Sequence, residues 1–118
     1  LVLVALDDDG RPLLLLSDLA DHSRNLRADA RAALLFDGTA GQADPLTGPR
    51  ATLLGRVEAV VEPAAIKSLK ARFVARHPGA AVYADFADFR LYRMDVESAY
   101  LVAGFGRINW LSAAEVIG

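Results

Sequence analysis

Four consecutive leucines, Leu13–Leu16, end at a Ser-Asp pair, and this junction limits the possible folds more than any other stretch of the sequence. An uninterrupted apolar run of this length is typical of a β-strand buried on both faces and is too short to cross a membrane. Ser17 and Asp18 are favoured N-cap residues, and a further aspartate follows three positions later, nearly as in a capping box. The sequence therefore predicts a strand that passes directly into a helix, with Leu19 and Leu26 facing inward.

Polar side chains cluster where this predicted strand meets the helix. The first turn of a helix presents free backbone N–H groups at the positive end of the helix dipole, and both favour an anion. Two interpretations stay open from the residues alone: a phosphate-type anion site, or an ordinary capped helix with solvated polar side chains. The candidate residues are Ser17, His22, Ser23, Arg24 and Asn25.

The rest of the chain shows strand patterns interrupted by one further helix. Pro63 suits the first turn of that helix, which we expect to end at His77-Pro78. The resulting order, ββαββαββ, does not alternate as a parallel sheet would, so we expect a mainly β fold, an antiparallel barrel with peripheral helices. Strands are expected over residues 1–6, 13–17, 31–36, 50–61, 88–96 and 99–103, with a hairpin turn at 7–12, a loop at 37–49 and a tight turn near Glu97-Ser98.

Composition narrows the classes of function. A length of 118 residues suits a single domain, residues 1–118, and 53% hydrophobic residues can fill its core. A net charge of −2 gives no electrostatic footprint for a nucleic acid. The sequence has no cysteine, which fits a cytoplasmic location, and no signal-peptide pattern or apolar run long enough for a membrane partner. Because the chain starts at Leu1 inside a strand-like segment, we expect an incomplete N-terminus.

Few residues offer catalytic or metal-binding chemistry. His22 lies in the first turn of a predicted helix and His77 at the end of the other, where a cap or loop role is expected. Two histidines and scattered aspartates have no metal-ligand spacing, so no metal site is predicted. The Gly-Phe-Gly-Arg stretch that ends at Arg107 is a weak motif by itself. Arg107 is either a ligand contact or simply exposed, and Trp110 is either a core residue or a platform for a cofactor.

Three stretches together carry a resemblance to a known family. They read LLLLSDLADHSRNLRADARAALLF, DPLTGPRATLLGRVEAV and ARHPGAAVYADFADFRLYRMDVESAYLVAGFGRINWL. In these stretches the chain closely resembles the pyridoxamine 5′-phosphate oxidase-like split-barrel proteins, and most of all the branch grouped with haem-utilisation proteins. The resemblance covers nearly the whole chain. The family normally has a further strand before the position of Leu1, and that strand is missing here. It implies an FMN-binding split barrel that dimerises, with the flavin at the subunit interface.

The resemblance also implies roles for individual residues. Ser17 matches a strand-end hydroxyl, and Arg50 matches a flavin-contacting glutamine at the start of the long strand. His22 and Ser23 match a pair that is Arg-Lys in true pyridoxamine phosphate oxidases. His-Ser lacks the two fixed positive charges that a dianionic phosphate favours, so that oxidase activity is not expected. Arg50 would otherwise form a surface ion pair, for example with Asp44.

Three functions are therefore considered. The first is an FMN flavoprotein, an oxidoreductase acting on an unknown small-molecule substrate, in which the flavin does the chemistry. The second is a haem-binding or haem-degrading haem-utilisation protein, for which only His22 and His77 supply imidazole ligands within this chain. The third is a binding module without redox chemistry. A homodimer is expected in each case, because Leu53 with Val57 and Leu54 with Val60 place apolar side chains on both faces of one strand.

Overall fold

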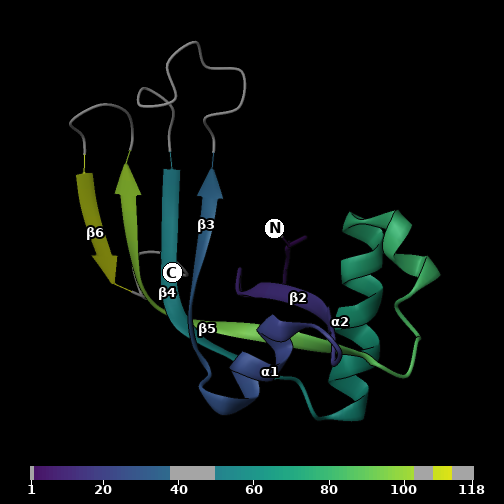
Figure 1. Cartoon of the computed structure of the whole chain (residues 1–118). Coiled ribbons are helices and arrows are strands. Elements are labelled where there is room, and N and C mark those ends of the chain that lie inside the picture. Colours follow the sequence, from purple (N-terminus) through teal and green to yellow (C-terminus); the bar gives the residue numbers. More distant parts are fainter. Residues whose placement is uncertain (1, 38–49, 103–107, 113–118) are drawn as a thin grey trace. The chain divides into compact units, whose positions relative to one another are not determined.

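A computed structural model describes residues 2–37, 50–102 and 108–112 (Figure 1). For residue 37 and residues 108–111 it describes the backbone alone. The chain divides into two compact units. Unit 1 comprises residues 1–30 and 57–95, and unit 2 comprises residues 31–56 and 96–118. Two strands run through both units, so each unit is described below by itself.

The described strands pair in antiparallel fashion in the order β1-β2-β5-β4-β3, and β6 also pairs with β5. The mainly β fold class is confirmed, but the strands expected over 88–96 and 99–103 form one strand, and the strand over 108–112 was not predicted. The strands are β1 (Ala5–Leu6), β2 (Pro12–Ser17), β3 (Arg31–Asp37), β4 (Arg50–Ala59), β5 (Phe89–Val102) and β6 (Ile108–Ser112), and the helices are α1 (Asp21–Ala28), α2 (Pro63–Arg76) and the short 3-10 helix η2 (Pro78–Val82).

The four leucines of β2 lie at the centre of unit 1. Their exposed fractions are between 0 and 6%, which confirms a strand buried on both faces. β2 pairs with β5 from Leu13 opposite Arg93 to Ser17 opposite Phe89. Alternate leucines of β2 join a core cluster with side chains of β1, α2, β5, η2 and the segment after η2: Ala5, Leu13, Leu15, Phe73, Ala80, Ala84 and Leu91.

Helix α1 starts later than the sequence predicted. Its N-cap is Ala20, which makes no side-chain cap hydrogen bond, and residues 17–20 form a turn in which the N–H of Ala20 donates to the carbonyl of Ser17 over 3.1 Å. The cap predicted at Ser17-Asp18 was therefore wrong, because tertiary partners engage both side chains. Leu19 was expected to face inward but is 77% exposed, because it lies in this turn and not on the helix.

The later elements follow the sequence more closely. α2 starts at Pro63 as predicted, and Phe73 is its buried residue. The tight turn expected near Glu97-Ser98 was wrong, because β5 continues through both residues. The in-out alternation persists there, since Met94 and Val96 are buried on either side of an exposed residue, and neither Glu97 nor Ser98 forces the backbone to turn.

Unit 2 consists of antiparallel ladders. β3 pairs with β4 from Arg31 opposite Arg56 to Asp37 opposite Arg50, and β6 pairs with the end of β5. β3 leaves Leu35 63% exposed. The predicted loop, the Gly-Phe-Gly-Arg stretch and the C-terminal tail lie outside the described residues, apart from Asp37 at the end of β3. Among the helices that are described, none is long and apolar enough to cross a membrane.

Candidate functional site

A pocket of about 330 Å³ lies in unit 1 at the corner between β2 and α1. Most of its lining is apolar or aromatic, and the polar groups are a hydroxyl from Ser17, a phenol from Tyr83 and the imidazole of His22. Such a lining, apolar with a few polar groups, is typical of small-molecule sites. The lining residues are Val2, Leu3, Leu15, Leu16, Ser17, Ala20, His22, Tyr83 and Phe89.

Ser17 is fixed by hydrogen bonds within the protein. Its hydroxyl donates to Oδ2 of Asp88 over 2.7 Å and accepts from the N–H of Leu19 over 3.2 Å. The backbone N–H of Asp18 also donates to the carbonyl of Asp88 over 2.6 Å. These bonds tie the end of β2 to the segment just before β5 and so position the pocket wall.

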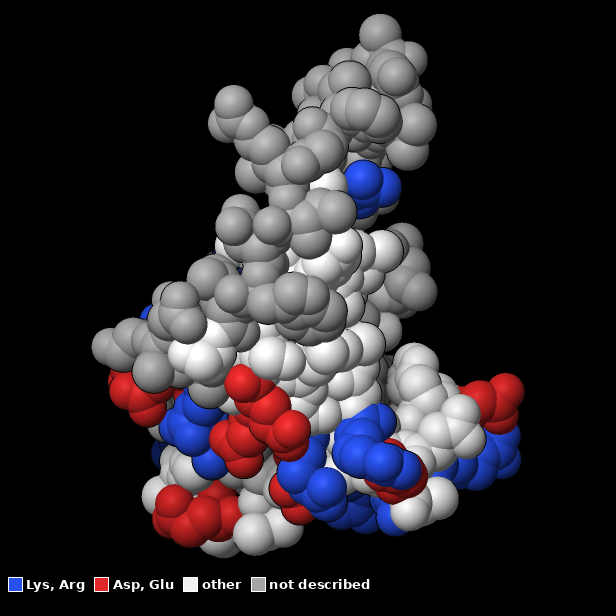
Figure 2. Space-filling view, turned by 90° about the vertical axis from the view of Figure 1, so that its left-hand side faces the viewer, with Lys and Arg blue, Asp and Glu red and all other residues white. Residues whose placement is uncertain are grey.

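The arginines around the corner are each paired with an aspartate. Nε of Arg90 donates to both carboxylate oxygens of Asp18 over 2.9 Å, and Nη1 of Arg27 approaches the same carboxylate at 3.4 Å. Arg24 pairs with Asp21. On the face of the molecule in Figure 2, acidic and basic side chains are intermingled. The three arginines thus share two carboxylates, and each guanidinium expected to be free for a phosphate is already in an ion pair.

The two histidines differ in their engagement. Nε2 of His77 lies 2.8 Å from the carbonyl oxygen of Val4, and the ring packs on Phe73 with centroids 5.2 Å apart. Since a carbonyl oxygen can only accept, Nε2 of His77 carries the hydrogen. His22 is exposed, lines the pocket and makes no hydrogen bond with any residue that the structure describes. His22 is therefore the histidine available to a ligand.

Ser23 and Asn25, the remaining predicted residues of the corner, do not line the pocket. Ser23 has an exposed fraction of 0%, and its hydroxyl has no hydrogen-bond partner among the described atoms. Direct contact between Ser23 and a ligand would require α1 to move. Asn25 is exposed, and its backbone carbonyl accepts from the N–H of Asp29 at the end of α1.

The other three predicted site residues belong to unit 2, and none of them is among the residues that line the corner pocket. Arg50 is half-buried at the start of β4, and its Nε is buried without a hydrogen-bond partner in the described part of the chain. Arg107 lies outside the described residues. Trp110 is described only through its backbone in β6, opposite Tyr100. Their predicted contacts with a cofactor stay predictions.

Sequence reasoning missed Tyr83 and Phe89 as pocket residues. Their rings pack against one another with centroids 4.8 Å apart, and both line the pocket. The aromatic-rich stretch from Tyr83 to Phe89 was the available signal, because three aromatics within seven residues are unusual in a short connection. Across the described residues, no group of three or more His, Asp or Glu side chains could hold a metal ion.

The architecture is that of the split-barrel proteins. A Clostridium acetobutylicum protein of the pyridoxinephosphate oxidase family, related to a general stress protein, has the same fold with a TM-score of 0.67. It is 13% identical, and the match covers 95% of this chain and 72% of that one, so it supports the fold alone. Within this class the chain belongs to the family described as CREG, beta-barrel, whose model matches residues 2–116.

Two more similar proteins are described by their relation to haem. The chain is 36% identical over 102 residues to the non-canonical heme oxygenase HOZ, a chloroplastic protein of Arabidopsis thaliana, covering 85% of this chain and 30% of that protein. It is 29% identical to a heme binding protein from Mycobacterium smegmatis, with a TM-score of 0.89, over 98% of this chain and 47% of that one. The chain thus spans less than half the length of either protein.

Proposed function

We propose that this chain is the haem-binding split barrel of a haem-utilisation protein. The carrying observation is the contrast between the histidines: His22 stands free beside an apolar and aromatic pocket, whereas His77 is held by Val4 and Phe73. A neutral imidazole is a common axial ligand of haem iron, and apolar walls suit the macrocycle. The similarity to a heme oxygenase and a heme binding protein supports the same choice.

The pocket residues fit a haem group in chemical type. His22 would bind the iron, and the side chains of Leu15, Leu16, Tyr83 and Phe89 would contact the ring. When bound, haem supplies the capacity for one-electron and oxygen chemistry. The volume of about 330 Å³ is small for a ligand pocket, so this chain would enclose the macrocycle only in part.

A second copy of the chain would supply the rest of the enclosure, and a homodimer is therefore part of the proposal. The exposed apolar side chains support it: Leu3 at the pocket is 52% exposed, and Leu35 on β3 of unit 2 is 63% exposed. Contiguous apolar patches mark interfaces, so the proposal expects a second copy to cover these side chains. A cytoplasmic location stays a prediction, and the Arabidopsis relative is described as chloroplastic.

The FMN interpretation has less support at this corner. It needed positive charge near Ser17, but Arg24, Arg27 and Arg90 are all paired with aspartates. Ser23, a second expected phosphate contact, is buried. An FMN phosphate would compete with these carboxylates for the arginines, whereas a haem ring would use the apolar wall and His22.

Titration of the purified protein with haem tests the proposal. We expect a Soret band distinct from that of free haem, with one saturating equivalent per chain. His22→Ala should shift that band and weaken binding, while His77→Gln, which keeps an N–H donor, should bind haem like the wild type. FMN should give no saturable change in flavin fluorescence. A free-haem spectrum in the wild type, or an unchanged spectrum in His22→Ala, would overturn the assignment.

A further inference from the structure

A second and larger pocket, of about 550 Å³, lies in unit 1 between α2 and the segment that includes η2. Its volume falls within the range of about 300–1,000 Å³ that is typical of small-molecule sites. None of the residues lining the corner pocket lines this one. The lining is Pro63, Ile66, Lys67, Lys70, Ala71, Val74, Ala81, Ala84 and Asp85.

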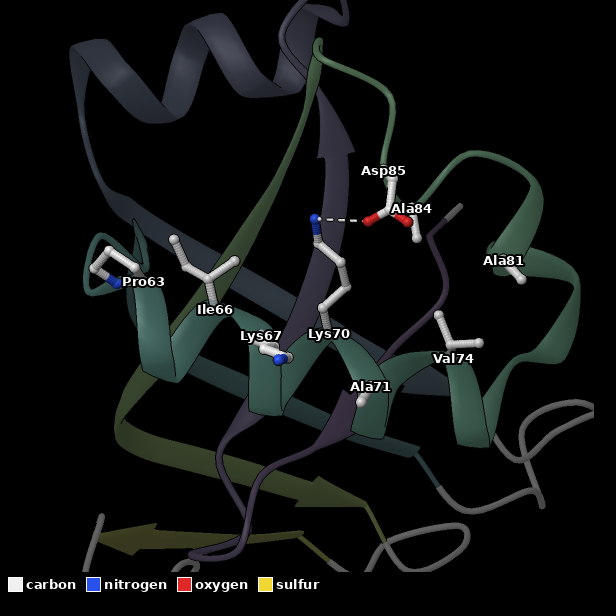
Figure 3. A pocket seen from close by; sticks show the side chains of 9 residues that line it. All are labelled: Pro63, Ile66, Lys67, Lys70, Ala71, Val74, Ala81, Ala84 and Asp85. Atoms are coloured by element: carbon white, nitrogen blue, oxygen red, sulfur yellow. Dashed lines mark hydrogen bonds and ion pairs between the residues drawn. The ribbon is translucent and has the colours of Figure 1, made fainter.

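Helix α2 forms one wall of this pocket, with apolar side chains on either side of a lysine. Ile66, Lys70 and Val74 are spaced four apart, so they lie one above another on the same face of α2. In Figure 3 the side chains of Ile66 and Val74 flank that of Lys70, which reaches across the pocket toward Asp85. Small side chains at Ala81 and Ala84 on the opposite wall leave the space open. The pocket is thus apolar along its length and cationic at one point.

The ammonium group of Lys70 is partly buried and has a single ion-pair partner in the described part of the chain. Its side chain is only 24% exposed, and its one described partner is the carboxylate of Asp85, with Nζ and Oδ1 3.5 Å apart. The side chain of Asp85 is 93% exposed and can turn to water. Lys67 also lines the pocket, but it is exposed, and Lys70 is the lysine that reaches Asp85. A partly desolvated lysine whose partner can turn to water favours an anionic group from a ligand.

We propose that this pocket binds a small amphipathic carboxylate, such as a medium-chain fatty acid. The carboxylate would take the place of Asp85 at Lys70, and the alkyl chain would lie along Ile66, Val74 and Ala84. Burial of the chain supplies most of the affinity, and the charge sets the orientation. The site is independent of the haem site at the corner.

Calorimetric titration of the protein with decanoate tests the site, with decanol and decylammonium as ligands of equal chain length and different charge. Decanoate should bind saturably with one equivalent per chain, and decanol and decylammonium should bind about tenfold or more weakly. Equal binding of decanol would overturn carboxylate recognition, and no saturable decanoate binding would overturn the site.

Variants separate the pocket from the surrounding surface. Lys70→Met keeps the apolar stem and should weaken decanoate binding about tenfold or more without changing decanol binding. Ala81→Phe should fill the space and abolish binding of both ligands. Arg76→Met, at a basic residue of the same helix that does not line the pocket, is the matched control and should bind decanoate like the wild type. Unchanged decanoate affinity in Lys70→Met would contradict the proposal.

The haem titration distinguishes failure of this site from failure of the proposed function. Decanoate should leave the Soret band and the haem affinity unchanged, and Lys70→Met should bind haem normally. If decanoate competes with haem, the two ligands share one site and the inference of a separate carboxylate pocket is wrong.

Discussion

The beginning of α1 and the end of α2 each carry a histidine, but the two regions treat it in opposite ways. At the end of α2, His77 bonds to the carbonyl of Val4 and packs on the buried ring of Phe73. At the beginning of α1, His22 lies at the surface beside a pocket, with no hydrogen bond among the described residues. One imidazole holds the N-terminal segment against a helix, and the other is exposed at the pocket where we propose that haem binds.

The contrast teaches that charge and residue type alone do not mark a site. The corner of α1 has three arginines, which the sequence alone makes attractive for an anion, yet each arginine meets an aspartate. Lys70 in the pocket beside α2 also meets an aspartate, but its side chain is only 24% exposed, whereas those of the three arginines are 49 to 61% exposed. We therefore take a partly buried charge that lines a pocket as a better indicator of a ligand than exposed charges that are paired with one another.

The largest effect should come from the anchor at the end of α2. Phe73→Ala removes a ring with 1% exposure from the core and should lower the free energy of unfolding by about 3–5 kcal/mol. Phe86→Ala is the matched control, because Phe86 is 53% exposed and should cost less than about 1 kcal/mol. Urea unfolding of both variants measures the difference. Equal losses would mean that Phe73 does not anchor α2.

Comparison of the two histidine variants tests the contrast directly. His77→Ala leaves the carbonyl of Val4 without its donor and exposes part of Phe73, so we expect a loss of about 1–2 kcal/mol in unfolding free energy. His22→Ala should change it by less than about 0.5 kcal/mol, as is usual at an exposed position. Denaturant midpoints without added haem give both values. A destabilised His22→Ala variant would show that its imidazole has a structural role.

Local patterns predicted much of the fold. The four leucines required a strand buried on both faces, and Pro63 fixed the start of α2, because both signals act within a few residues. The prediction of a turn near Glu97-Ser98 was wrong, because β5 continues through both residues. Neither residue is a strong turn former, and the ladder to β6 begins at Ser98.

The site was less predictable because its contacts are far apart in sequence. Ser17 bonds to Asp88 across 71 positions, and Asp18 pairs with Arg90 across 72. These long-range partners remove Ser17 and Asp18 from helix capping, and α1 starts three residues after Asp18. The spacing of apolar residues did not indicate that Tyr83 lines the pocket, because Tyr83 follows a short 3-10 helix and lies in no strand or α-helix.

The smallest expected effect distinguishes two serines at the same corner. Ser17→Ala removes a hydroxyl that donates to Asp88 and accepts from Leu19, so unfolding free energy should fall by about 1 kcal/mol. Ser23→Ala removes a buried hydroxyl without a described partner and should be neutral or stabilising by up to about 0.5 kcal/mol. Both are the same chemical change within one corner, and thermal and urea unfolding resolve their difference.

The result at Ser23 also tests the site at the corner. Because the hydroxyl of Ser23 is fully buried, haem affinity should be the same in Ser23→Ala and in the wild type. Ser17 lines the pocket, so Ser17→Ala should change haem affinity slightly through the altered wall. If Ser23→Ala instead loses more than about 1 kcal/mol of stability, its hydroxyl has a partner such as a buried water. If it loses ligand affinity without loss of stability, α1 moves on binding and Ser23 reaches the ligand.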